Sequence, residues 1–189
     1  MSPRSSRSSR SPRPLRSAVK TAAAVATAAA FALTAAPAHA ATDPDPSVWT
    51  ELSKTTQATA KYGYEGFAAA GGYARTDTCV ADPAEGGMGY HYVNPANIGS
   101  VDPQKPAALV YADGFTNTYT GTSSGGPRKL VAVEWIGKDT GQATAPTLFG
   151  QTFQKGQLPG YFTLHAWLYK PNSAGLFAAW NPEVVCPTV

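Results

Sequence analysis

The stretch KLVAVEWI at residues 129–136 decides the fold, because β-branched, aromatic and other apolar residues fill it apart from one lysine and one acid. A short run of this kind is typical of a β-strand. Successive side chains of a strand point to opposite faces of the sheet. One face would carry Val131, Val133 and Trp135, and the other Leu130, Ala132, Glu134 and Ile136. Neither face suits water, so we expect other parts of the chain to cover both.

Runs of the same character recur along the chain, separated by Pro, Gly, Asn and Asp. They predict strands at residues 89–93, 108–112 and 162–169, and a short one around residues 149–153. The stretch at residues 120–127 has no apolar residue and predicts an exposed turn between the second and third strands. No helix-length connection separates these strands, so we expect antiparallel pairing. The pattern predicts a curled antiparallel sheet or partial β-barrel of about four to six strands.

A helix is predicted before the strands. Asp45 followed by Pro46 has the chemistry of a helix N-cap with proline in the first turn. Apolar and small side chains then recur every three or four residues, at Val48, Leu52, Thr55, Thr59 and Tyr62. Gly63 and Gly66 weaken the second half, and Gly71 with Gly72 ends it. The fold class is therefore α+β, with an N-terminal helix packed on the sheet.

The first 40 residues have the three parts of a secretion signal. Six basic side chains and no acid open the chain, an alanine-rich run follows at residues 21–37, and Ala38-His-Ala40 is a small-x-small cleavage site. We predict a cleaved signal at residues 1–40, a proline-rich lead-in at 41–46 and a single globular domain at 47–189. The mature protein would be secreted from a bacterial cell, with no membrane insertion after signal removal.

Signal removal reverses the charge of the chain. All twelve acidic residues but only nine of the fifteen basic residues lie beyond residue 40, which leaves a net charge near −3. An acidic domain lacks the electrostatic attraction on which nucleic acid binding depends. We expect no nucleic acid partner.

The two cysteines, Cys79 and Cys186, are expected to pair, because an exported protein meets an oxidising environment. The bridge would close a loop of just over a hundred residues and stabilise the fold by about 4 to 5 kcal/mol on the chain-entropy account. The alternative is two separate buried thiols.

Three side chains within the predicted strands have metal-binding chemistry: His91, Glu134 and His165. If the strand register brings them together, two imidazoles and one carboxylate would suit a divalent metal such as Zn, Fe or Cu. One alternative is that all three only form hydrogen bonds in the core. Another is a metal-free site in which they act as acid, base and orienting group.

Aromatic residues suggest a second kind of site. Trp135, Trp167 and Trp180, with nearby tyrosines such as Tyr92, could form a stacking platform for a sugar or another planar ligand. The alternative is that these rings cover one end of the core, where Asn94-Pro95 and Asn181-Pro182 set turns.

Several catalytic signatures are absent from the sequence. It has no Gly-x-Ser-x-Gly, His-Glu-x-x-His, phosphate-binding Gly-rich loop or Cys-x-x-Cys. A pair of acids for hydrolysis is still open, since such pairs form in space and leave no spacing. We therefore predict a binding module for a small ligand or metal ion with an aromatic-lined pocket. The alternatives are a secreted metal-dependent or acid/base hydrolytic enzyme that uses the same His and Glu residues, and a purely structural exported protein.

Taken as a set, the strand motifs resemble those of small secreted bacterial proteins of uncharacterised function. These proteins combine an MGxHYVNP segment, here at residues 88–95, with an LHxWxxxxNPxGxFxxWNPxVxC ending, here at residues 164–186. The resemblance covers residues 61 to 186. It implies export, one domain and the pairing of Cys79 with Cys186, and it marks the two histidines and Glu134 as motif members. It implies no activity. Tyr64 stands where an acid is expected, and residues 170–175 depart from the Asn-Pro-x-Gly form.

Overall fold

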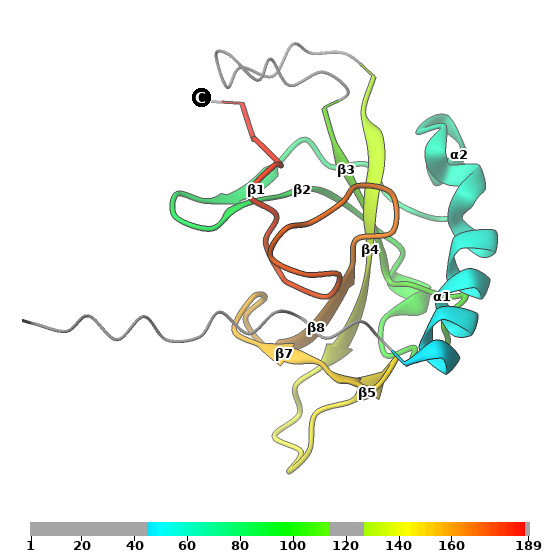
Figure 1. Ribbon diagram of the computed structural model, residues 1–189, viewed down its shortest axis with the longest axis vertical. Coiled ribbons are helices and arrows are strands. Elements are labelled where there is room, and N and C mark those ends of the chain that lie inside the picture. The colour runs from blue at the N-terminus through cyan, green and yellow to red at the C-terminus, as the bar shows by residue number, and fades with distance from the viewer. Residues whose placement is uncertain (1–44, 114–126, 188–189) are drawn as a thin grey trace, which may run out of the picture. The chain divides into compact units, whose positions relative to one another are not determined.

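A six-stranded antiparallel sheet forms the centre of the fold in the computed structural model, which describes residues 45–113 and 127–187 (Figure 1). The predicted signal, nearly all of the lead-in and most of the predicted turn at 120–127 lie outside these residues. The strands run in the order β1-β2-β3-β4-β8-β7. Their bounds are β1 Cys79–Asp82, β2 Gly86–Val93, β3 Ala108–Ala112, β4 Lys129–Lys138, β7 Gln154–Lys155 and β8 Tyr161–Ala166. The expected α+β class with a curled antiparallel sheet is confirmed.

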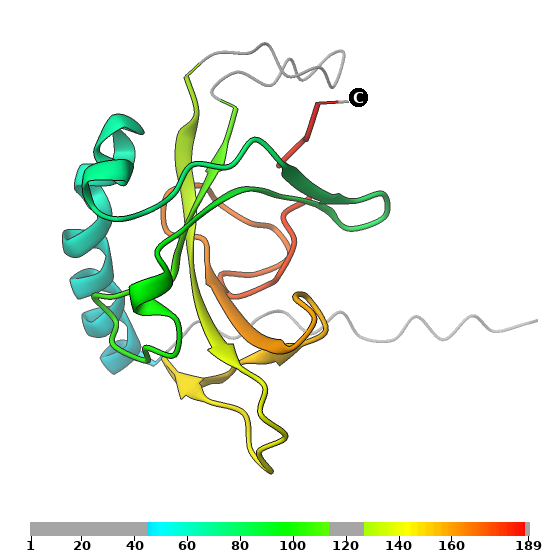
Figure 2. The same cartoon turned by 180° about the vertical axis from the view of Figure 1, so that it is seen from behind.

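The helices lie on one side of this sheet, as two opposite views show (Figures 1 and 2). Helix α1 (Pro46–Thr59) begins where the sequence predicts, with the Asp45 side chain accepting from the Ser47 backbone N–H at 2.8 Å. The helix gives way to a 3-10 turn, η1 (Ala60–Gly63), and then to the short helix α2 (Gly66–Ala70). The predicted interruption near the two glycines is therefore present.

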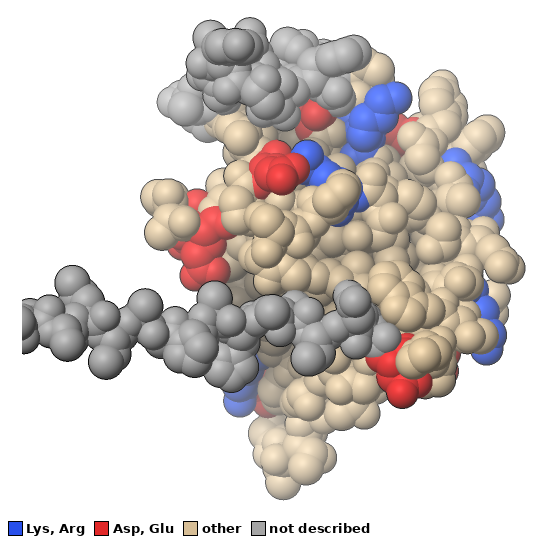
Figure 3. Space-filling view, viewed as in Figure 1, with Lys and Arg blue, Asp and Glu red and all other residues tan. Residues whose placement is uncertain are grey.

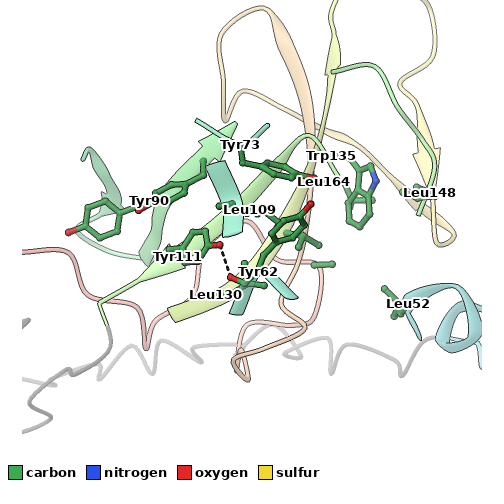
Figure 4. Close-up of a cluster of buried hydrophobic side chains, with 14 of the residues drawn as sticks. Leu52, Tyr62, Tyr73, Tyr90, Leu109, Tyr111, Leu130, Trp135, Leu148 and Leu164 are labelled. Atoms are coloured by element: carbon green, nitrogen blue, oxygen red, sulfur yellow. Dashed lines mark hydrogen bonds between the residues drawn. The ribbon is translucent and has the colours of Figure 1, made fainter. Parts of the chain in front are cut away.

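Between α1 and the sheet lies the main core, part of which Figure 4 shows with the hydrogen bond between Tyr111 and Tyr62 dashed. The Tyr111 hydroxyl donates to the backbone oxygen of Tyr62 at 2.7 Å and so ties η1 to β3. A smaller cluster covers the opposite face, where Val184 of the C-terminal segment packs with Val110 and Trp167. Both faces of the sheet are therefore covered, as the apolar faces of the 129–136 strand predict. The face assignment at the start of that strand was wrong, because an irregularity in the β3–β4 register places Leu130 with Val133 and Trp135 and turns Val131 to the opposite face.

Two predicted strands are not observed at their full length, whereas β2 and β4 extend beyond their predicted bounds. A short strand was expected around residues 149–153, but only Gln151–Thr152 is a strand (β6), and Phe149 and Gly150 form the turn that joins it to β5 (Thr147–Leu148). Phe149 and Gly150 both adopt positive φ there, at 56° and 70°, which extended backbone does not allow. The last strand ends at Ala166 rather than residue 169, because the Trp167 backbone N–H donates to Leu176 outside the sheet.

A β-bulge distorts β2 beside β1. Val80 pairs with Gly89 and Ala81 with Gly87, so Met88 is an extra residue without a partner on β1. Gly89 adopts a φ of +106°, and a Cβ there would lie 2.3 Å from the backbone oxygen of Tyr111. Bulges of this kind redirect a side chain near functional sites.

We expect Gly89→Ala to lower the free energy of unfolding by on the order of 3 kcal/mol, because a strained φ is combined with a steric clash. Gly141→Ala is the matched control, since Gly141 has a φ of +82° but nothing within 4 Å of the added Cβ. Urea denaturation of both variants measures the difference. Equal losses of unfolding free energy in the two variants would mean that the close approach of residue 89 to the Tyr111 backbone does not affect stability.

The expected disulfide is present between Cys79 and Cys186, whose Cα atoms lie 5.6 Å apart across a sequence separation of 107. It joins β1 to the C-terminal segment. Among the described residues, no helix is long and apolar enough to cross a membrane. Basic and acidic side chains are interspersed on the face drawn in Figure 3.

Candidate metal centre

Strand register places the two histidines and the acid on one face of the sheet. Glu134 of β4 lies directly opposite His165 of β8 on one side and Ala108 of β3 on the other. His91 of β2 lies one row away on the same face, opposite Val110. Since β2 and β4 are separated by two strand spacings, roughly 9 to 10 Å, His91 and Glu134 must reach towards each other over β3. The short side chain of Ala108 leaves room for this.

The three side chains converge to within metal-ligand spacing. The Nε2 atoms of His91 and His165 are 3.4 Å apart. His91 Nε2 lies 3.6 Å from Glu134 Oε2, and His165 Nε2 lies 3.6 Å from Glu134 Oε1. One ligand atom from each residue can be chosen so that all three lie within 4.8 Å of one another. The arrangement can hold a single metal ion.

Burial favours the neutral form of all three groups. Glu134 and His165 are 4% and 2% exposed, whereas 18% of the His91 side chain is exposed to solvent. Loss of solvation raises the pKa of Glu134 to about 8. It lowers the pKa of His91 to about 4 and that of His165 to about 3. At neutral pH without a metal, the cluster therefore holds a protonated carboxyl and two neutral imidazoles.

Outer contacts hold the ligands in place, as metal-binding imidazoles generally require. The His91 ring interacts with the backbone of Gly89, which opposes the fall in the His91 pKa. The His165 ring stacks on Trp167, with the ring planes inclined by 13°. Thr163 Oγ1 is buried and, among the described residues, has no hydrogen bond of normal geometry, yet it lies close enough to Glu134 to oppose the rise in its pKa. A buried polar atom without a good partner fits a site that accepts a further group.

The raised pKa of Glu134 gives the metal-free protein a defined pH dependence. The unfolded chain releases this proton near pH 4.5, whereas the folded chain keeps it until about pH 8. The contribution of this bound proton to the free energy of unfolding is complete below pH 4.5. It is lost as the pH rises towards 8, at about 1.4 kcal/mol per pH unit. The two histidines act in the opposite direction, because their unfolded imidazoles still bind protons near pH 6.5, and this contribution has largely gone above about pH 7.5.

Compared with the wild type, Glu134→Gln should therefore make the slope of the unfolding free energy against pH more positive by about 1.4 kcal/mol per pH unit between pH 6 and 7. Urea denaturation of chelator-treated protein at several pH values measures it. Glu85→Gln, which changes an exposed carboxylate in the β1–β2 turn, should keep the wild-type slope. A Glu134→Gln slope equal to that of the wild type would show that the buried carboxyl ionises normally.

A cavity of about 200 Å³ opens beside the metal-ligand cluster. His91 and Glu134 line it, whereas His165 lies behind them. The other lining residues are mainly apolar and come from β1, β2, β4 and the loop before β8: Val80, Met88, Val93, Ile136, Gln157 and Leu158. Access to the cluster is therefore from the His91 side.

The structure does not bring the predicted aromatic residues together. Trp135 and Tyr92 alternate with Glu134 and His91 along their strands, so they lie on the opposite face, in the core beneath the helices. Trp135 donates to the Asp102 backbone oxygen at 2.9 Å and appears in the buried cluster of Figure 4. Trp180 lines a separate pocket. Of the three tryptophans, Trp167 alone contacts the metal-ligand cluster.

Tyr92 belongs instead to a polar cluster around Arg128. The Arg128 guanidinium donates to the Tyr92 hydroxyl at 2.7 Å and to the Thr76 backbone oxygen at 2.6 Å, and it lies 3.4 Å from the centre of the Tyr90 ring. The Tyr92 hydroxyl also donates to Glu65. With these partners Arg128 is satisfied although only 9% of its side chain is exposed.

Sequence reasoning missed the apolar lining of the cavity. Met88 lies at the β2 bulge and lines the cavity. The only sequence signal for irregular backbone there was the pair of glycines, Gly87 and Gly89, on either side of it. Val80 and Leu158 lie in a short strand and a loop that carry no strong apolar pattern.

Comparisons of the chain with protein-family models, with curated proteins and with solved structures find no match.

Proposed function

We propose that the protein is a secreted metal-binding module that holds one zinc ion between His91, Glu134 and His165. The observation that carries this proposal is the convergence of two imidazole nitrogens and a carboxylate on one buried spot. Carboxylate and imidazole are ordinary zinc ligands, and three protein ligands with one open position are typical of reactive zinc sites. Export is supported by the predicted signal and by the disulfide, which is compatible with an oxidising compartment.

The spacing of the ligand atoms favours tetrahedral coordination. Zinc–nitrogen bonds of about 2.0 to 2.1 Å place two tetrahedral ligands about 3.4 Å apart, whereas right-angled octahedral ligands would be about 2.9 Å apart. The imidazole nitrogens are 3.4 Å apart, and each lies 3.6 Å from one carboxylate oxygen. The nitrogen–nitrogen separation is that of two tetrahedral ligands, which favours zinc over metals that require octahedral sites. The two 3.6 Å separations are to different oxygens of Glu134, so the carboxylate must turn slightly for one oxygen to complete the set.

Charge balance also supports a divalent ion. Two neutral imidazoles can donate lone pairs without losing a proton, which is the form that burial favours. Only Glu134 must release a proton, and the carboxylate then faces the metal rather than an apolar wall. A single cation thus turns a costly buried charge into a paired one.

Isothermal titration of zinc into chelator-stripped protein, residues 41–189 without an affinity tag, tests the proposal. We expect one ion per chain, weaker binding by Glu134→Gln and unchanged binding by Glu85→Gln. Binding that is absent, or that Glu134→Gln leaves unchanged, would contradict the site.

Hydrolytic chemistry is the second candidate function, and the cavity beside His91 favours it. A zinc ion with an open position lowers the pKa of bound water to about 7 and can polarise a carbonyl group. Release of product from a panel of small ester substrates by zinc-loaded protein, and not by Glu134→Gln, would establish it. Equal rates with and without protein would exclude that chemistry for the panel.

A further inference from the structure

We propose that the cavity beside the metal centre binds a short aliphatic carboxylate, with its carboxylate on the metal and its chain along the apolar walls. This inference rests on the proposed metal site and names the class of ligand that the site would take. It is carried by the lining of the cavity, by the charge of the loaded site and by the volume of the cavity.

The cavity walls suit a hydrocarbon chain. Five of its eight lining residues are apolar: Val80, Met88, Val93, Ile136 and Leu158. Ile136 and Met88 are buried at 3% and 4% exposure and form the inner wall. Val80 and Leu158 are 36% and 41% exposed and form the rim, where apolar side chains would otherwise contact water. Apart from the two metal ligands, Gln157 is the single polar residue that lines the cavity in the described part of the chain.

The charge at the inner end of the cavity favours an anionic head group. A divalent ion held by one carboxylate and two neutral imidazoles keeps one net positive charge. Within residues 45–113 and 127–187, no acidic residue other than Glu134 lines the cavity. In such apolar surroundings the binding of a second anion at the open coordination position is strongly favoured, because the anion neutralises this positive charge. Hydroxide could supply that charge, but it would leave the apolar walls in contact with water.

The volume limits the length of the chain. An apolar cavity of about 150 Å³ is enough for a benzene molecule, which has six non-hydrogen atoms. A cavity of about 200 Å³ therefore has room for roughly eight, the number in hexanoate. A longer chain would extend beyond Val80 and Leu158 into solvent.

The test uses protein loaded with Co²⁺, whose visible absorption reports a change of ligand at the metal. Acetate, butyrate, hexanoate and octanoate are titrated in turn. We expect affinity to rise about fourfold for each added methylene up to hexanoate, then to level off at octanoate. Hexylamine, with a cationic head on a similar chain, should leave the spectrum unchanged.

Leu158→Asn removes one rim contact without touching a metal ligand, and Val101→Asn is the matched control at an exposed apolar site outside the cavity. We expect the first variant to bind hexanoate at least about fivefold more weakly and the second to match the wild type. Both should bind cobalt normally.

The outcomes separate the two proposals. Cobalt binding with no spectral response to hexanoate, or with the same affinity for all four acids, overturns the ligand assignment and leaves the metal site intact. Failure to bind cobalt or zinc at all overturns both.

Discussion

Replacing His91 with alanine should weaken zinc binding by more than about a hundredfold, because the loss of an outer contact to a metal ligand already costs about ten- to a hundredfold. His91 is the informative position, since its side chain keeps 18% exposure whereas His165 is almost fully buried. The variant should therefore fold, which makes a loss of binding interpretable.

Thermal unfolding with and without zinc measures this effect. Zinc at a hundredfold excess over its dissociation constant should stabilise the wild type by about 2.7 kcal/mol and leave His91→Ala nearly unaffected. His165→Ala should also lose zinc stabilisation, at the additional cost of a cavity in the core. Glu85→Gln should respond to zinc as the wild type does. Equal zinc stabilisation of His91→Ala and the wild type would place the metal elsewhere.

Loss of the Cys79–Cys186 disulfide should lower the free energy of unfolding by about 4 kcal/mol, because the bridge closes a loop of more than a hundred residues. The double variant Cys79→Ser, Cys186→Ser tests this in urea denaturation. Reductant should destabilise the wild type to a similar degree and have no effect on the double variant. A loss below about 1 kcal/mol would show that the unfolded chain is already restricted without the bridge.

The disulfide also bears on the metal centre. It anchors β1, whose Val80 forms part of the cavity rim, and β1 pairs with the stretch of β2 that precedes His91. We therefore expect the serine double variant to retain zinc binding, because no metal ligand lies on β1.

Local sequence patterns predicted much of the fold. The Asp45-Pro46 start of α1, the strand at 108–112 and the start of β4 at Lys129 agree with the structure. The β5–β6 turn was missed because Phe149 adopts a positive φ, which apolar residues rarely do. Strand β1 was missed because its short CVAD sequence lacks an alternating apolar pattern, and pairing with β2 stabilises it.

The candidate site was predictable by residue type but not by position. Histidines and a lone acid within apolar strands indicated the three side chains, whereas their meeting depends on strand register and on the small Ala108 between them. The placement of Trp135 and Tyr92 on the other face follows from the same alternation. Metal binding, secretion and the resemblance to small secreted bacterial proteins stay predictions.

X-ray absorption at the zinc edge of the loaded wild-type protein tests the central claim most directly. We predict four light-atom ligands at about 2.0 Å and the outer-shell scattering of two imidazoles, reduced to one imidazole in His91→Ala loaded at a zinc concentration high enough to compensate for its weaker binding. A spectrum without imidazole scattering, or one that His91→Ala leaves unchanged, would contradict the assignment of zinc to His91, Glu134 and His165.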